Sequence, residues 1–364
     1  MMGNLKNILV IGGSYTGLAL AKQLSTSLPA SFRVILIEPH SHFNHLFALP
    51  RFAVASGDEH KAFIPYTSVF ANATEPDKHL VVRARVQSLR PDHVTLDRDW
   101  AGSNRIGFDY AVVATGTRLP APGTIPSDEK PVGVEYLRSY QNRVKEARRI
   151  VIVGGGAIGV QMATDIKEIY PDKEVTLVHS REKLMPSFHP KMDEILRSRL
   201  GELGVEVVTG SRAVMPKEDV GAGNKPETVE LSLQNGRRIP ADLVIPATGQ
   251  IPNNQFVELS QLSEKGFIKV RPTLQFQGEE YSRVFAAGDI ADSGAQKAAK
   301  PGIAQAGVVT KNILSLISGQ DPQGHAEIIS NRIHVTMGLK MNMVFRNPET
   351  KDGETEPTVI PRDE

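Results

Sequence analysis

The chain has 364 residues, of which 40% are hydrophobic and 23% charged. This length and composition allow two or three domains with sizeable cores and argue against extended disorder. Lysine and arginine number 42 and aspartate and glutamate 41, for a net charge of +1, which gives no basic footprint for nucleic acid. The sequence has no cysteine, which excludes disulfides, thiolate metal sites and cysteine redox chemistry.

The sequence shows neither a membrane-spanning run nor a secretory signal. No apolar stretch approaches the roughly 18 residues that a transmembrane helix needs, and the first residues lack the regions of a signal peptide. We therefore expect a cytoplasmic protein, with peripheral membrane contact and oligomeric state left open.

The first predicted elements are a strand, a glycine-rich turn, a helix and a second strand. An apolar run over 7–11 leads into a turn from Gly12 to Gly17, then a helical stretch and an apolar run that ends at Glu38. In a dinucleotide-binding unit such glycines allow a tight turn and close approach of a pyrophosphate to the helix N-terminus. Ser14 replaces the middle glycine, so its hydroxyl must fit beside the pyrophosphate. An acid at Glu38 predicts an unphosphorylated adenosine ribose, as in FAD or NAD.

The same pattern occurs a second time in the chain. An apolar run over 149–153 leads into a turn from Gly154 to Gly159, a helical stretch and an apolar run over 174–178. Continuous apolar strands joined by a helix are typical of parallel sheets covered on both faces. Two copies in the same strand–turn–helix context are a much stronger signal than one glycine motif. The alternative for either copy is a glycine turn that only closes a helix onto a sheet.

The second copy differs from the first at the residue that would meet the ribose. His179 stands where the first copy has Glu38, and Ser180 and Arg181 follow it. No acid repels a 2′-phosphate there, and a guanidinium is available to bind one, so we expect this copy to prefer NADPH over NADH. The alternative for Arg181 is a solvated loop residue. The residues expected to contact NAD(P)H are Gly154, Gly156, Ala157, Ile158, Gly159, His179, Ser180, Arg181 and Gly249.

Three further strands end in small or acidic residues. The segments 110–116 and 243–249 are near-duplicates, each an apolar strand that ends in Ala-Thr-Gly. Such small residues suit a point where the chain leaves one domain beside a bound dinucleotide. The segment 283–289 ends in Gly-Asp, and its carboxylate, Asp289, is suited either to accept a hydrogen bond from a polyol or to cap the next helix.

This ordered set of motifs resembles the FAD-dependent pyridine-nucleotide oxidoreductase superfamily over residues 7 to 318. Within it, the AMID or ferroptosis-suppressor-like members of the apoptosis-inducing-factor-like group are the most similar. The strings that carry this resemblance are 43–51 (FNHLFALPR), 62–66 (AFIPY), 170–180 (YPDKEVTLVHS) and 272–275 (PTLQ).

The resemblance implies an α/β fold of two Rossmann-like, three-layer nucleotide-binding domains. A discontinuous FAD domain would comprise 1–118 and 243–318, with an NAD(P)H domain over 119–242 inserted into it. Residues 319–364 would form a short C-terminal segment with a polar tail.

The resemblance also assigns roles to individual residues. The residues expected to contact FAD are Gly12, Gly13, Ser14, Tyr15, Thr16, Gly17, Glu38, Arg51, Val86, Ala114, Thr115, Gly116, Gly288, Asp289, Lys300 and Pro301. Lys300 and Gln161 are the catalytic candidates. Many relatives have glutamate where this chain has Gln161, which removes a carboxylate expected near the nicotinamide. We expect no metal, and we expect the loop with His40, His42 and His45 to close over the FAD adenosine.

The function that the resemblance implies is transfer of a hydride from NAD(P)H to FAD. Since there is no cysteine beside the flavin, electrons would then go directly to a small, quinone-like acceptor. The alternatives are a type II NADH dehydrogenase, a biosynthetic flavoenzyme that acts on one metabolite, and a signalling flavoprotein that senses NAD(P)H.

Overall fold

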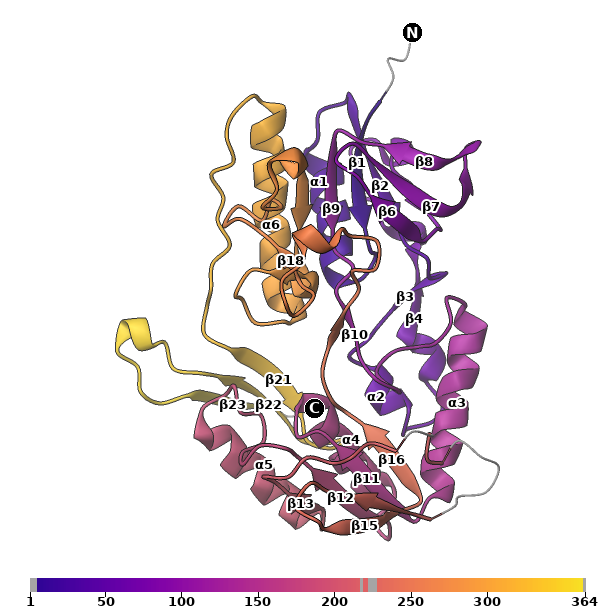
Figure 1. Ribbon diagram of the computed structural model, residues 1–364, viewed down its shortest axis with the longest axis vertical. Coiled ribbons are helices and arrows are strands. Elements are labelled where there is room, and N and C mark those ends of the chain that lie inside the picture. Colours follow the sequence, from indigo (N-terminus) through magenta and orange to yellow (C-terminus); the bar gives the residue numbers. More distant parts are fainter. Residues whose placement is uncertain (1–4, 217–218, 222–227, 363–364) are drawn as a thin grey trace. The chain divides into compact units, whose positions relative to one another are not determined.

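The computed structural model describes residues 5–216, 219–221 and 228–362. The chain divides into two compact units, shown in Figure 1. The first unit consists of residues 1–44, 63–118 and 251–328, and the second of residues 45–62, 119–250 and 329–364.

A five-stranded parallel sheet organises the first unit. Its order is β19-β9-β1-β2-β5. Helices α1 (Tyr15–Ser27) and α6 (Ala299–Ile317) contact each other on one face, and the antiparallel sheet β6-β7-β8 covers the other (Figure 1). The strands are β1 (Lys6–Ile11), β2 (Phe32–Ile37), β5 (Leu80–Val82), β6 (Val86–Leu89), β7 (His93–Trp100), β8 (Ser103–Gly107), β9 (Tyr110–Val113) and β19 (Val284–Ala286).

The side chains of the central strand, β1, alternate between the two faces of the sheet, and this explains the three layers. In β1, Ile8 and Val10 pack with the residues of α1 and α6, whereas Leu9 and Ile11 pack with those of β6–β8. Successive side chains of a strand point to opposite faces, so a continuous apolar strand builds two cores at once.

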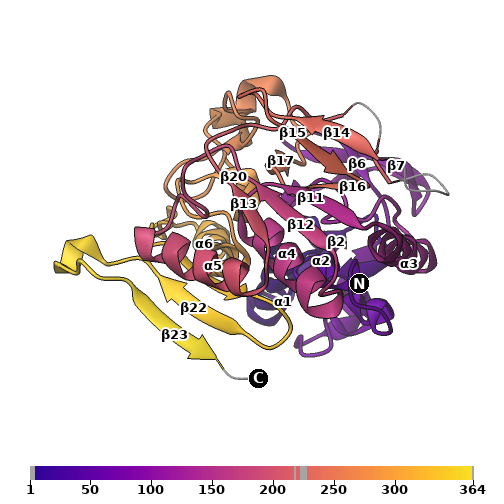
Figure 2. The same ribbon diagram turned by 90° about the horizontal axis from the view of Figure 1, so that it is seen from below.

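A second parallel sheet organises the other unit, in the order β13-β12-β11-β16. Figure 2 shows this sheet between the hairpin β14–β15 and the helices α4 and α5. The strands are β11 (Arg149–Val153), β12 (Glu174–Val178), β13 (Glu206–Val208), β14 (Val229–Ser232), β15 (Arg238–Ala241) and β16 (Leu243–Pro246). The helices are α2 (Leu49–Phe52), α3 (Lys130–Glu146), α4 (Ala157–Ile169) and α5 (Pro190–Glu202).

The C-terminal residues form a three-stranded antiparallel sheet in the second unit. It comprises β21 (Arg332–Thr336), β22 (Asn342–Arg346) and β23 (Thr358–Arg362). The expected polar tail therefore includes a paired strand. The shorter strands elsewhere are β3 (His42–Asn44), β4 (Phe63–Pro65), β10 (Thr117–Arg118), β17 (Ile251–Pro252), β18 (Ile268–Lys269) and β20 (Ala291–Asp292). The 3₁₀ helices are η1 (Glu59–Ala62), η2 (Tyr66–Ser68), η3 (Pro76–Lys78), η4 (Leu259–Gln261), η5 (Glu279–Tyr281), η6 (Gly288–Ile290) and η7 (Thr350–Asp352).

The architecture confirms the expected fold class of two Rossmann-like layered units. The unit boundaries differ from the expected ones. Strand β16 pairs with β11, so the second unit extends past 243 to residue 250, and it also takes in residues 45–62 and 329–364. Strands β10 and β17, which stand in the first unit directly before residue 119 and directly after residue 250, pair antiparallel. Among the described residues, no helix is both long and apolar enough to cross a membrane.

Candidate dinucleotide-binding sites

The first glycine turn is closed by backbone contacts that only glycine allows. Gly12 has φ +103°, and a Cβ there would lie 2.6 Å from the carbonyl oxygen of Ala114. A Cβ on Gly17 would lie 1.8 Å from the carbonyl oxygen of Gly12. The Ala-Thr-Gly end of β9 thus lies directly against the turn. Its Thr115 hydroxyl donates to the carbonyl of Asn253 at 2.7 Å, which ties it to the returning chain.

Ser14 presents a polar atom that the protein itself does not satisfy. Ser14 is the N-cap residue of α1, yet its side chain makes no capping hydrogen bond. Its Oγ is buried without a hydrogen-bond partner. A buried hydroxyl left unpaired costs free energy, and a pyrophosphate at this helix N-terminus would accept its hydrogen bond. The serine therefore fits the phosphates of a dinucleotide.

Glu38 lies against the backbone of this turn and of the segment that follows β2. Its buried carboxylate accepts a hydrogen bond from the Gly13 amide at 2.5 Å and from the His40 amide at 3.0 Å, and it pairs with the His40 ring. The Tyr66 hydroxyl donates to the Gly13 carbonyl at 2.9 Å, and burial raises the pKa of Tyr66. The side chains of Glu38, His40 and Tyr66 border a cavity of about 760 Å³, whose lining also includes Arg83. The cavity has the polarity and acid that an adenosine ribose requires.

The second turn repeats this geometry. Gly154 has φ +131°, and a Cβ there would lie 2.2 Å from the carbonyl oxygen of Ala247, the counterpart of Ala114. The Gly155 amide donates to His179 Nδ1 at 3.0 Å, as Gly13 does to Glu38. A Cβ on Gly156 would meet open space, which leaves room for a phosphate at the N-terminus of α4.

The surroundings of His179 favour its neutral form. Burial lowers its pKa, and the nearby positive charge of Arg181 lowers it further. Its Nδ1 accepts a hydrogen bond, so the ring carries its proton on Nε2. Arg181 itself is exposed and follows β12 at the same edge of the sheet as the glycine turn. The two copies therefore place a carboxylate in one site and a neutral imidazole beside a cation in the other.

Asp289 lies in η6, shortly after the end of β19. The N-cap of the following α-helix, α6, is Ala298. The carboxyl of Asp289 is mostly buried, which raises its pKa, while Lys297 opposes that shift. The preceding amide, of Gly288, donates to the side chain of Gln305 at 2.7 Å. The helix-cap alternative for Asp289 is thus not realised, and its carboxylate remains suited to a polyol.

The remaining predicted residues lie in varied surroundings. Lys300 and Pro301 start α6, with Lys300 exposed, and Val86 is buried in β6 opposite Leu96. Arg51 forms a two-pronged ion pair with Asp165 of α4. The sequence analysis did not single out Asp165, the partner of Arg51, or Lys297, the cation near Asp289. The spacing of Asp165 one helical turn after Gln161 was the only available signal for the first of them.

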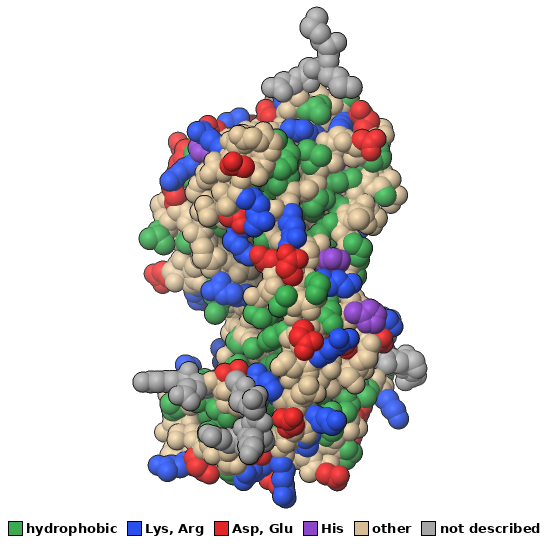
Figure 3. Space-filling model, turned by 90° about the vertical axis from the view of Figure 1, so that its right-hand side faces the viewer, with side chains coloured by type: hydrophobic (Ala, Val, Ile, Leu, Met, Phe, Trp, Pro, Cys, Tyr) green, Lys and Arg blue, Asp and Glu red, His purple; other side chains and the backbone are tan. Residues whose placement is uncertain are grey.

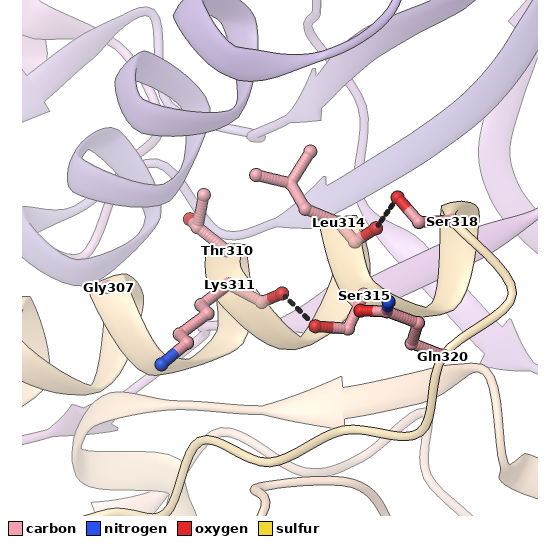
Figure 4. Close-up of a pocket in the computed structure, with 7 residues that line it drawn as sticks. All are labelled: Gly307, Thr310, Lys311, Leu314, Ser315, Ser318 and Gln320. Carbon is pink, nitrogen blue, oxygen red and sulfur yellow. Dashed lines mark hydrogen bonds between the residues drawn. The ribbon is translucent and has the colours of Figure 1, made fainter.

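A second, smaller pocket of about 380 Å³ lies along α6 (Figure 4). The hydroxyls of Ser315 and Ser318 both donate to carbonyls one turn earlier in the same helix, at 3.1 and 3.0 Å. Because carbonyls of α6 already accept from these two hydroxyls, we take the two glycine turns, and not this pocket, as the candidate functional sites.

The family model for pyridine nucleotide-disulphide oxidoreductases matches residues 6–309. The chain belongs to this family. Family membership confirms an oxidoreductase that uses FAD and NAD(P)H. The two turns differ in the side chain that accepts from the glycine amide, which is Glu38 in the first and His179 in the second.

Three curated relatives of this oxidoreductase resemble it over most of their length. Fe-regulated protein 8 of Mycosarcoma maydis is 40% identical over 86% of this chain and 81% of its own. FAD-dependent oxidoreductase FVFD30 of Flammulina velutipes is 32% identical over 72% and 78%. Ferroptosis suppressor protein 1 of Mus musculus is 31% identical over 85% and 80%, which confirms the resemblance to that group.

A solved structure supports the fold of this family member. The NAD-dependent persulfide reductase from A. fulgidus superposes with a TM-score of 0.70 at 21% identity. The match covers 93% of this chain and 64% of that one, so the chain spans under two thirds of that protein's length.

Proposed function

We propose that this protein is an FAD-dependent NAD(P)H oxidoreductase that passes electrons directly to a small, quinone-like acceptor. The first glycine turn binds FAD and the second binds NADPH. The unpaired Ser14 hydroxyl and the open space at Gly156 support this assignment, since each leaves a helix N-terminus ready for phosphates. The quinone-like acceptor follows from the resemblance given above.

The protein's residues supply binding and orientation. Bound FAD would supply the chemistry of accepting a hydride from the reduced nicotinamide and passing two electrons on to the acceptor. Glu38 holds the FAD ribose, Ser14 and the N-terminus of α1 hold its phosphates, and Asp289 holds its polyol chain. Gln305 fixes the backbone at Gly288, directly before Asp289, with a 2.7 Å hydrogen bond. No cysteine is present to carry electrons away from the flavin.

Mixing the purified protein anaerobically with NADPH tests this function. We expect the flavin absorption to bleach, and the colour to return on addition of a quinone faster than with ferricyanide or dioxygen. Failure of the flavin to bleach would contradict the proposal. Bleaching that a single metabolite reverses, but no quinone does, would favour the biosynthetic alternative.

A signalling role makes a different prediction in the same experiment. It requires nucleotide binding to change the oligomeric state, with little turnover. A role on DNA would also call for a basic surface, whereas basic and acidic side chains are interspersed on the face in Figure 3, and the net charge is +1.

Cofactor choice provides a separate prediction for Arg181. We expect Arg181→Ala to raise KM for NADPH more than for NADH, because a charged contact to the 2′-phosphate is worth about 1.5–3 kcal/mol. Steady-state kinetics with both nucleotides measure the difference. The control is Arg148→Ala, an exposed arginine that precedes β11 at the opposite edge of the sheet. Equal effects on both nucleotides would refute the role of Arg181.

A further inference from the structure

The segment that carries Arg181 is fastened to the rest of the second unit through its backbone. It comprises residues 180–185, which follow β12 at the edge of the sheet where the second glycine turn lies. The Met185 amide donates to the carbonyl of Gly155, within that turn, at 2.9 Å. The Gly210 amide, shortly after β13, donates to the carbonyl of Arg181 at 3.1 Å. One end of the segment is therefore tied to the glycine turn and the other to the end of the next strand but one.

Two side chains of α5 complete this attachment. Asp193 accepts the Leu184 amide at 2.8 Å and pairs with Arg197, whose Nε donates to both carboxylate oxygens at 3.0 Å. Arg197 also donates from a terminal nitrogen to the Glu182 carbonyl at 2.8 Å. The Asp193 side chain is only 15% exposed, so water competes little for these hydrogen bonds. The pair thus holds the middle of the segment, from Glu182 to Leu184.

This attachment maintains a backbone conformation that bulky residues rarely adopt. Met185 has φ +47°, in the left-handed region. Leu184 and Met185 are buried, and the Leu184 side chain lies 2.5 Å from where a Cβ on Gly155 would be. Such a conformation persists only where the surrounding structure determines it. The segment is therefore a preset element of the site and not an adaptable loop.

The side chain of Arg181 contrasts with this fixed backbone. It is exposed, and within the part of the chain that the structure describes its guanidinium makes no hydrogen bond or ion pair. The nearby arginines of α5, Arg197 and Arg199, are both paired with carboxylates. A free guanidinium on a fixed backbone is preorganised for an anion, because binding costs only the freedom of its own side chain.

We propose that Asp193 and Arg197, here termed the α5 pair, are positioning residues for nucleotide choice. They hold the segment 180–185 so that the Arg181 guanidinium meets the 2′-phosphate of NADPH. This inference rests on the proposed function, which assigns NADPH to the second glycine turn. Neither member of the α5 pair contacts the nucleotide. Both act through the backbone on Arg181, and loss of either lets the segment relax and carries the guanidinium away.

The same helix provides a matched control. Glu194 directly follows Asp193 and pairs with Lys191 at 2.9 Å, and both side chains are exposed. Among the described interactions, no hydrogen bond or ion pair joins Glu194 to the segment 180–185. Glu194→Ala therefore removes a carboxylate from α5 without releasing the segment.

Calorimetric titration of the purified, flavin-loaded protein with NADP⁺ and with NAD⁺ tests the proposal without turnover. For Asp193→Ala and Arg197→Met we expect the dissociation constant of NADP⁺ to rise about fivefold or more, because part of a charged contact is lost. That of NAD⁺ should change less than about twofold, and Glu194→Ala should leave both within about twofold of the wild type. Arg197→Met keeps the aliphatic stem of the side chain and carries the test if Asp193→Ala does not fold.

A double variant supplies a readout that a merely structural role would not give. If the α5 pair acts through Arg181, it has nothing left to position once that guanidinium is gone. Adding Asp193→Ala to Arg181→Ala should therefore weaken NADP⁺ binding by less than about twofold beyond Arg181→Ala alone, so that the two effects are not additive.

Three results would overturn the proposal. Equal weakening of both nucleotides would make the α5 pair a support of the glycine turn itself. Additive losses in the double variant would show that the pair acts independently of Arg181. A selective effect of Arg181→Ala with no effect of the α5 variants would contradict this inference alone. If Arg181→Ala also left both affinities unchanged, the proposed choice of NADPH would be wrong instead.

Discussion

Replacing the last glycine of either turn is expected to abolish one dinucleotide site and spare the other. In Gly17→Ala the new Cβ would lie 1.8 Å from the carbonyl oxygen of Gly12, and in Gly159→Ala it would lie 1.8 Å from that of Gly154. Each turn must move away from its helix, which destroys the phosphate site. The strain costs about 1–3 kcal/mol of stability.

Absorbance spectra and NADPH titrations of the purified variants separate the two sites. Gly17→Ala should lose most of its FAD, whereas Gly159→Ala should retain FAD but no longer be bleached by NADPH. Gly201→Ala is the matched control, because this helical glycine of α5 has open space around its Cβ position. If Gly159→Ala lost FAD while Gly17→Ala kept it, the assignment of the two turns would be reversed.

The second large effect is expected at Asp289. Asp289→Ala should purify with depleted FAD, because it removes a mostly buried carboxylate from the end of β19. A hydrogen bond to a charged group is worth about 1.5–3 kcal/mol, so FAD affinity should fall roughly ten- to a hundredfold.

Flavin-to-protein absorbance ratios and refolding with added FAD measure this loss. Asp289→Asn keeps an acceptor oxygen and should retain more FAD than Asp289→Ala. Asp292→Ala, at an exposed position three residues later, should keep its full complement. Full flavin occupancy in Asp289→Ala would contradict the polyol role.

The sequence was most informative where chemistry is local. The glycine turns, Glu38 and the Ala-Thr-Gly strand ends were all predicted, and the structure adds why they belong together. The carbonyls of Ala114 and Ala247 lie where a Cβ on Gly12 or Gly154 would have to be. Strand, turn and helix are neighbours in the chain, so their spacing carries most of the required information.

Non-local pairing could not be predicted in the same way. Strands β9 and β16 are both short, apolar and followed by Ala-Thr-Gly, yet β9 pairs with β1 and β16 with β11, which moved the expected boundary at 243. Arg51 and Asp165 lie 114 residues apart, and neither side chain signals its partner. The C-terminal strands were also hidden, because β23 follows a polar stretch that reads as a solvated tail.

An anaerobic titration of the holoenzyme with NADPH tests the central claim most directly. In this account the first site holds FAD and the second holds the NADPH that reduces it. Because the chain has no cysteine, the flavin is the electron store, and it holds only two electrons per FAD. The account predicts that one equivalent of NADPH per FAD completes the bleaching and that one equivalent of a quinone restores the oxidised spectrum. A flavin that NADPH does not bleach, or a preparation that takes up two equivalents per FAD, would contradict it.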